Sequence, residues 1–186
     1  MDRGETNWCE RAVRDAVLNG DVEAWREWYA AHFDCLAKYV RWRCGGLADL
    51  TDDVIQEAWL TAVRKLRAFD PDKGPFFGWL RGIAANAARN HLRARLRERK
   101  RSCRLDPDHE AAHAGVDPAG VEKAERVAAA LAAIPDHYEA VLRAKYLDQN
   151  SVAQIADARG DSTKAVESLL TRARQAFREA YEKSHD

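Results

Sequence analysis

Apolar residues recur every three or four positions along most of this chain, and no stretch alternates with the period of two that strands require. The first long stripe follows Asp21, a good helix cap, and is broken by Gly45-Gly46. Its members are mostly aromatic: Trp25, Trp28, Tyr29, Phe33, Leu36, Tyr39 and Val40. The pattern predicts an all-α protein with a helix over this stretch.

The same spacing predicts the remaining helices. One should begin after Thr51-Asp52-Asp53, acids suited to a helix N-terminus, and bury Ile55, Ala58, Trp59, Ala62, Val63 and Leu66. After a loop at 70–75, another should continue to about residue 100 and bury Phe76, Phe77, Leu80, Ile83, Ala84 and Ala87. The later helices are expected at 121–134, at 152–159, from 163 to about 181, and after Pro135, with a stripe of Tyr138, Val141, Leu142 and Tyr146.

The tryptophans divide the chain into two packing units. All six lie at or before Trp79, and the second half is rich in alanine instead. We therefore expect two small helical domains, at 15–100 and 121–183, joined by a flexible acidic linker at 101–120 that contains Pro107 and Gly115. The chain has no run of about 18 apolar residues and no apolar leader, so we expect a cytoplasmic protein without membrane insertion.

Charge is unevenly distributed although the net charge is zero. Residues 1–104 carry 20 basic and 15 acidic side chains, whereas residues 105–186 carry 10 and 15. Between residues 89 and 104, eight basic side chains are opposed only by Glu98. On a helix, Arg89, Arg93, Arg97 and Lys100 share a face. Such a run is often only a solvated surface, but next to Trp79, Asn86 and Asn90 it suits single-stranded or melted DNA.

Residues 151–174 have the spacing of a helix-turn-helix. Ala156 is a small residue where a second helix could cross, Gly160 suits a turn with positive φ, and Val166 can face back at the first helix. Asp161, Ser162 and Thr163 are candidate caps of the second helix. A helical hairpin with no DNA role is the alternative. The expected DNA contacts are Ser162, Thr163, Lys164, Glu167, Ser168, Thr171, Arg172 and Arg174.

These motifs together resemble the sigma-70 superfamily of RNA polymerase sigma factors, in its compact extracytoplasmic-function (ECF) type. The resemblance is found in three segments in the family's order: Asp53–Leu60, Phe77–Asn90, and Ile134-Pro135 followed by Arg172-Ala173-Arg174. It implies that Asp53, Gln56, Glu57 and Leu60 bind core RNA polymerase. It also implies that Trp79, Asn86, Arg89, Asn90, Arg93 and Arg97 melt and bind the −10 element, and that loop 69–76 forms a flipped-base pocket.

The resemblance further implies that the C-terminal helix-turn-helix reads a duplex −35 element. It implies contacts with the clamp and flap regions of core polymerase, an anti-sigma factor as partner, and no catalysis or cofactor. Many relatives are basic where this chain has Glu167 and Leu169, and many have His where it has Thr171. Because residues 126–186 carry nine basic and nine acidic side chains, we expect this domain to bind DNA weakly alone.

Three other hypotheses are weighed against this one. A stand-alone transcriptional regulator would use the same helix-turn-helix without polymerase, and an adaptor that binds only proteins would leave the basic face at 89–104 unexplained. Cys103, His109 and His113 have spacing that a zinc or redox site could use, although scattered thiols and linker histidines are the simpler interpretation. No nucleophile–base pair or phosphate-binding glycine loop is recognisable, so we expect no enzyme.

Overall fold

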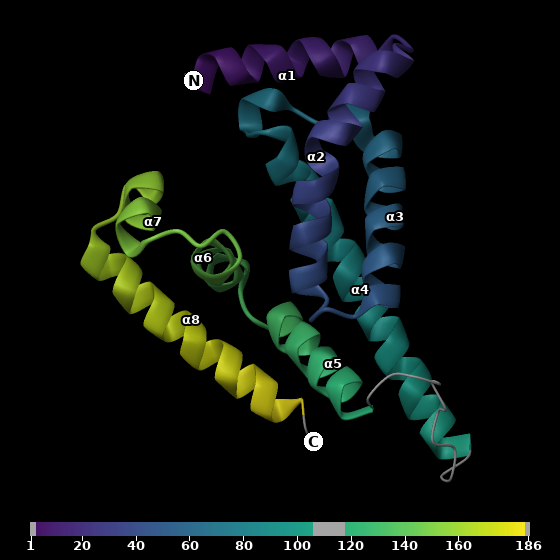
Figure 1. The fold of residues 1–186 in the computed structure, drawn as a ribbon, viewed down its shortest axis with the longest axis vertical. Coiled ribbons are helices and arrows are strands. Elements are labelled where there is room, and N and C mark those ends of the chain that lie inside the picture. The colour runs from purple at the N-terminus through teal and green to yellow at the C-terminus, as the bar shows by residue number, and fades with distance from the viewer. Residues whose placement is uncertain (1–2, 106–117, 185–186) are drawn as a thin grey trace. The chain divides into compact units, whose positions relative to one another are not determined.

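The computed structural model describes residues 3–105 and 118–184, and in these ranges every regular element is a helix (Figure 1). The predicted all-α class is therefore confirmed. The α-helices are α1 (Arg3–Leu18), α2 (Val22–Arg43), α3 (Ala48–Lys65), α4 (Phe76–Leu105), α5 (Pro118–Ala133), α6 (Asp136–Tyr146), α7 (Val152–Arg159) and α8 (Thr163–Lys183). Two short 3₁₀ turns, η1 (Leu66–Ala68) and η2 (Pro71–Lys73), lie between α3 and α4.

The helices form two units, one built around α1–α4 and the other around α5–α8. The helical bounds differ from the expected domain limits at three points. Helix α1 begins at Arg3, well before residue 15, α4 continues to Leu105, and α5 already begins at Pro118. Within the described residues, no helix is both long and apolar enough to cross a membrane.

Aromatic side chains fill the core of the first unit, as the tryptophan distribution predicted. The rings of Trp28 and Phe76 stack with centroids 3.9 Å apart, and Phe69 meets Phe76 edge-on at 5.4 Å. Trp59 adds a third layer, with its ring 4.5 Å from that of Tyr29. The contacts join α2, α3, α4 and the segment between α3 and α4. In Figure 1, α2, α3 and α4 run beside one another and α1 lies across one end of them.

Helix α3 differs from the sequence prediction in its start and in its buried face. It begins three residues before Thr51, so Asp49 rather than Asp53 is the acid of its first turn. Asp49 gains a partner there, because the Arg95 guanidinium of α4 donates to its carboxylate and lowers its pKa. Val54 is fully buried, whereas Val63, expected in the core, is 53% exposed. The buried face of α3 is therefore rotated from the predicted one, because it includes Val54 and excludes Val63.

In the second unit, α8 packs against α5, α6 and α7. The buried cluster is apolar throughout and consists of Leu131, Ile134, Val141, Leu142, Ile155, Ala156, Val166, Leu170 and Ala173. Pro135 precedes α6 in the cap position, where its missing N–H costs nothing. Tyr146, expected in the buried stripe of α6, is 54% exposed.

Gly160 makes the turn between α7 and α8 possible, and its replacement gives a first testable prediction. Its φ is +69°, and a Cβ added there would meet no atom within 4 Å. Gly160→Ala therefore adds backbone strain without a clash, and should lower the free energy of unfolding of the second unit by about 1 kcal/mol. Hydrogen exchange of the buried amides of α7 and α8 measures this loss.

Gly82→Ala is the matched control for this variant. Gly82 has equally open surroundings, but it lies within helix α4, where alanine is the better helix former. That variant should stabilise the first unit by up to about 1 kcal/mol. Equal effects of the two substitutions would contradict the assignment of strain to the Gly160 turn.

Candidate functional site

The pair α7 and α8 has the local geometry of a helix-turn-helix. Helix α7 starts with a capping box, in which the Ser151 hydroxyl accepts the N–H of Gln154 and the Gln154 side chain accepts the N–H of Ser151. It ends at Gly160 in the left-handed conformation, as predicted. Ala156 and Val166, the residues expected where the two helices meet, are both buried in the same apolar cluster. The sequence prediction of this motif is confirmed.

Helix α8 is capped by Ser162, one of the three predicted candidates. Its hydroxyl accepts the N–H of Ala165 at 3.2 Å. Asp161 instead pairs with Arg159 across the turn, at 2.8 Å from its Nε. Because serine caps a helix through its acceptor lone pair, the Ser162 hydroxyl proton remains a donor for a ligand oxygen.

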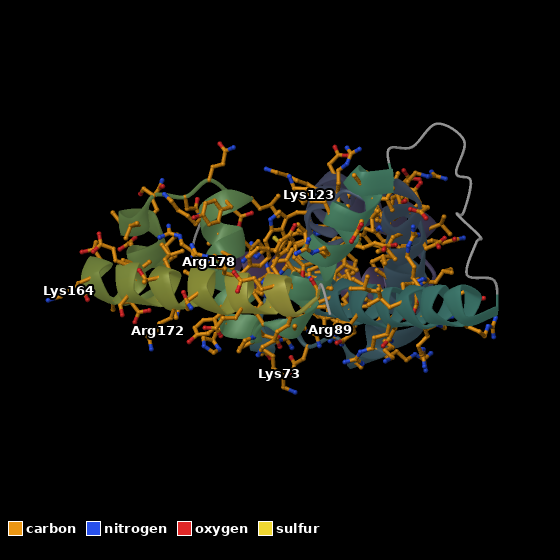
Figure 2. All side chains as sticks on the ribbon, turned by 90° about the horizontal axis from the view of Figure 1, so that it is seen from below. Lys73, Arg89, Lys123, Lys164, Arg172 and Arg178 are labelled. Carbon is orange, nitrogen blue, oxygen red and sulfur yellow. The ribbon has the colours of Figure 1, made fainter. Side chains whose placement is uncertain are left out.

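The outer face of α8 is polar along its length. The eight predicted DNA contacts are all exposed: Ser162, Thr163, Lys164, Glu167, Ser168, Thr171, Arg172 and Arg174. At about 100° per residue, the side chains most nearly opposite the buried stripe include Lys164, Ser168, Thr171, Gln175 and Glu179. Figure 2 shows Lys164 and Arg172 projecting outward from α8. Gln175 was not among the predicted contacts, although continuing the helical spacing from Lys164 reaches it on the same face.

Arg174 lies at the flank of this face and is held by α6. Its Nε donates to the Tyr146 hydroxyl at 2.8 Å, and its guanidinium lies 5.8 Å from the centroid of the same ring. The guanidinium therefore has a fixed direction before any ligand arrives. Sequence reasoning assigned Tyr146 to the core because an aromatic residue at helical spacing is indistinguishable from a buried one.

The basic end of α4 carries a second polar face. Asn86, Asn90, Arg93 and Arg97 are exposed, and Arg89 is half-buried. The Arg97 Nε donates to the backbone oxygen of Arg93 one turn earlier. This face therefore combines amides with cationic groups, at intervals of one helical turn.

Trp79, which was grouped with this face in the prediction, is only partly exposed. Its ring contacts those of Phe69 and Phe76, with centroids 5.4 and 5.7 Å apart. One edge of Trp79 is thus part of the aromatic core, and only the remaining surface is open to a ligand.

Helix α3 presents a different kind of surface. Asp53, Gln56 and Leu60 are exposed at intervals of three or four residues, and Val63 continues the row. Leu60 and Val63 are 52% and 53% exposed, among the largest exposures of apolar side chains in the described residues. Exposed apolar residues in adjacent helical turns are typical of a surface that another protein covers.

Glu57, expected on this surface, is occupied within the domain. Its Oε2 lies 2.6 Å from Nε2 of His91 on α4, and its side chain is less than half exposed. Glu57 therefore links α3 to the helix that carries the amide and arginine face. Asp53, Gln56, Leu60 and Val63 form the exposed row of α3, called the docking row below for the role we propose, and Glu57 stays a predicted contact beside it.

Between α3 and α4, residues 66–75 form a compact connection. The Asp70 carboxylate accepts the N–H of Asp72 and caps η2, and the Lys73 ammonium lies 3.4 Å from the same side chain. Phe69 and Pro71 are buried, whereas Lys73 extends outward (Figure 2). The connection therefore has apolar anchors below a polar, exposed tip.

The candidate zinc site lies outside the residues whose side chains the structure describes, because Cys103, His109 and His113 fall between 102 and 118. Among the described residues, no group of three or more His, Cys, Asp or Glu side chains could hold a metal ion.

Solved structures with similarity to this chain include a complex of CnrH with the cytosolic domain of CnrY. That chain is 25% identical with a TM-score of 0.49, and the match covers 93% of this chain and 97% of that one. A second is the sigma factor RpoE of Bartonella quintana in complex with the anti-sigma factor NepR. It is 17% identical with a TM-score of 0.44, and the match covers 87% and 98% of the two chains.

Similarity in sequence extends over both domains. Curated relatives include the ECF RNA polymerase sigma factor SigD of Mycobacterium tuberculosis and of Mycobacterium bovis, each 29% identical over 177 residues, which is 91% of this chain and 82% of the relative. The family model of Sigma-70 region 2 matches residues 28–98, and that of Sigma-70 region 4 matches residues 124–177. The chain therefore belongs to the sigma-70 family, and is an ECF-type sigma factor that acts in promoter-specific transcription initiation with RNA polymerase.

Proposed function

We propose that this chain works as a dissociable specificity subunit through three surfaces. Helix α3 docks on core polymerase, the amide and arginine face of α4 captures the melted −10 element, and α8 reads the duplex −35 element. The observation that carries this proposal is where the exposed surfaces lie. Those of α3 and α4 are within the residues that match the region 2 model, and that of α8 is within the residues that match the region 4 model. On this proposal, 15–100 holds the first two activities and 121–183 the third.

The face of α4 has the chemistry that single-stranded DNA requires. Flexible cations such as Arg93 and Arg97 neutralise phosphates, and the amides of Asn86 and Asn90 can donate to and accept from base edges that are no longer paired. The open surface of Trp79 offers a ring on which a base can stack. Arg89 completes the basic row from its half-buried position.

The N-terminal half of α8 suits the major groove of duplex DNA. In a helix-turn-helix, the first turns of the second helix reach base edges, and here they carry Lys164, Glu167 and Ser168. Glu167 can accept from the N4 amino group of cytosine, which contributes selectivity while repelling phosphate. Arg172 and Arg174 flank this region and are placed to hold the two phosphate backbones.

A docking role for this row of α3 accounts for the exposure of two apolar side chains in adjacent turns. Leu60 and Val63 would lose contact with water on a partner helix, while Asp53 and Gln56 supply acceptors for basic or polar groups of that partner. We assign this partner as the clamp of core polymerase and extend the proposal to contacts of the C-terminal domain with the flap.

Three further parts of the proposal follow from family membership. The protein does no catalysis of its own, because polymerase supplies the chemistry. It works in the cytoplasm, where the polymerase is. An anti-sigma factor holds it inactive until a signal arrives, by covering surfaces that polymerase and DNA would use.

Run-off transcription tests the proposed function. With purified core polymerase and a pool of genomic templates, the chain should give transcripts from defined start sites. Leu60→Asp should reduce them at least about tenfold, because a charge in an apolar contact loses more than 1.4 kcal/mol of binding. We choose Leu60 rather than Glu57, since replacing Glu57 would also break its contact with His91.

Val22→Asp is the control, because Val22 is 67% exposed at the first turn of α2, where an acid is tolerated. It should leave transcription unchanged. A chain that protects duplex DNA alone but yields no transcript with polymerase would be a stand-alone regulator, and the sigma assignment of its surfaces would fail.

Salt dependence tests the −35 surface. For the holoenzyme on a promoter fragment, Arg172→Ala and Arg174→Ala should each weaken binding and reduce the slope of log K against log salt by about 0.9 per lost phosphate contact. Lys183→Ala removes the same charge from the last turn of α8 and should leave the slope unchanged. Equal changes in all three variants would indicate only a general charge effect.

A further inference from the structure

Helix α4 begins without a cap from its own sequence neighbourhood. The two residues before it are Gly74 and Pro75, and neither has a side chain that can accept a hydrogen bond. The first N–H groups of a helix nevertheless need acceptors, especially beside a buried residue such as Phe76. The acceptor comes from α1, where the two carboxylate oxygens of Glu10 lie 3.1 and 3.0 Å from the Phe76 nitrogen.

Forming this contact removes the Glu10 carboxylate partly from water. Burial raises the pKa of its carboxyl group, and the N–H of Phe76 opposes that change by lowering it. A half-buried carboxylate that faces a helix N-terminus is stabilised by the unpaired N–H groups there. Glu10 therefore acts as a capping group for a helix that begins 66 residues later in the chain.

Two arginines of the same turn of α1 hold the rest of the connection. The Arg14 Nη1 donates to the backbone oxygen of Phe69 at 2.9 Å, and the Arg11 Nη2 lies 2.6 Å from the Asp72 carboxylate. The Asp15 carboxylate accepts from the other nitrogens of Arg14 and fixes its direction. Residues 10, 11 and 14 thus reach the end, the middle and the beginning of segment 69–76.

Within the segment, the side chain of Asp70 contacts Asp72 and Lys73, and both partners are exposed. The short 3₁₀ turn adds hydrogen bonds from the Lys73 N–H to the Asp70 carbonyl and from the Gly74 N–H to the Pro71 carbonyl. These contacts are all local, whereas the polar contacts from α1 join the segment to a helix far away in the chain. Gly74 has a φ of +152°, which few other residues adopt, so the backbone there has wide conformational freedom once contacts are lost. Figure 1 shows α1 lying across this segment, and η1 and η2 are both in contact with α1.

We propose that Glu10, Arg11 and Arg14 are positioning residues, which hold segment 69–76 in the single conformation that the −10 element meets. None of the three has to touch DNA. The inference rests on the proposed function, because it assumes that this segment takes part in −10 binding. It assigns to α1 a specificity role: weakening the clamp should reduce discrimination between −10 sequences more than it reduces core binding.

The expected loss of discrimination comes from the fraction of molecules in which the segment has the binding-competent conformation. A segment that samples several conformations presents the binding-competent one for only part of the time, and alternative conformations accept bases that the clamped one rejects. Core docking through α3 and −35 binding through α8 use other surfaces, so they should be unaffected.

The experiment uses the full chain in reconstituted holoenzyme. The probe is the strongest promoter found by run-off transcription, together with its single-base −10 variants and single-base −35 variants. Glu10→Ala should lower the ratio of transcription between the parent promoter and its −10 variants by about fivefold, the size expected for a lost helix cap. Arg11→Ala combined with Arg14→Ala should lower it in the same direction. Ratios for the −35 variants and affinity for core polymerase should not change.

Two further variants separate positioning from simple destabilisation. Glu10→Gln keeps an oxygen that can accept the Phe76 N–H, and should retain most of the selectivity. Glu23→Ala combined with Arg26→Ala removes an exposed ion pair of 2.5 Å between two side chains of α2, and should leave selectivity intact. In the free chain, hydrogen exchange at residues 69–76 should accelerate in Glu10→Ala while that of α3 does not.

The outcomes are distinguishable. If the unsubstituted chain gives no transcript, the proposed function itself fails. If Glu10→Ala transcribes with unchanged −10 ratios, or if it loses −10 and −35 discrimination equally, the positioning role is overturned. If Glu10→Ala does not fold, the double arginine variant and Glu10→Gln decide, and unchanged −10 ratios in the arginine variant would again overturn it.

Discussion

The stacking of Trp28 on Phe76 is the contact on which the first domain depends. Phe76 is fully buried, and its ring also meets those of Phe69 and Trp79. Because Phe76 is the first residue of α4, this packing fixes where the helix starts, and thus which of its faces points inward as far as Leu92, the last buried residue of α4 in the described range. Asn86, Asn90, Arg93 and Arg97 are exposed as a consequence. An aromatic cluster in the core therefore helps to set the position of polar groups on the outer face of α4.

The second domain reaches the same result with aliphatic residues in place of aromatic ones. Ala156 and Val166 pack in one apolar cluster, and the left-handed turn at Gly160 lets the chain change direction between them. Once Val166 and Leu170 face inward, the geometry of 3.6 residues per turn leaves Lys164, Ser168 and Thr171 outside. In both domains the surface that we propose as a binding surface lies opposite a buried stripe. The residues of the proposed binding surfaces are thus those on the helix faces that the core packing leaves exposed.

Features that depend on neighbouring residues could be predicted from the sequence. The helix-turn-helix, the Ser162 cap, the Gly160 turn and the tryptophan-rich unit are all local in this sense. The errors are at positions where helical spacing cannot tell a core from an interface: Val63 and Tyr146 fit a buried stripe and are exposed. Contacts across the chain could not be predicted at all. Glu10 with Phe76, Asp49 with Arg95 and Glu57 with His91 join residues 34 to 66 positions apart, and no pattern in the sequence pairs them.

Zero net charge is compatible with DNA binding because the charge is distributed locally. The arginine row on α4 and the polar face of α8 each offer only a few phosphate contacts, and residues 126–186 are balanced in charge. A few contacts give weak affinity at physiological salt. Two weak contacts joined through a third, apolar contact on polymerase gain from effective concentration, since the second binding event becomes intramolecular. On the function we propose, such a chain binds a promoter firmly only as part of holoenzyme, and the exposed Leu60 and Val63 make that assembly the controlling step.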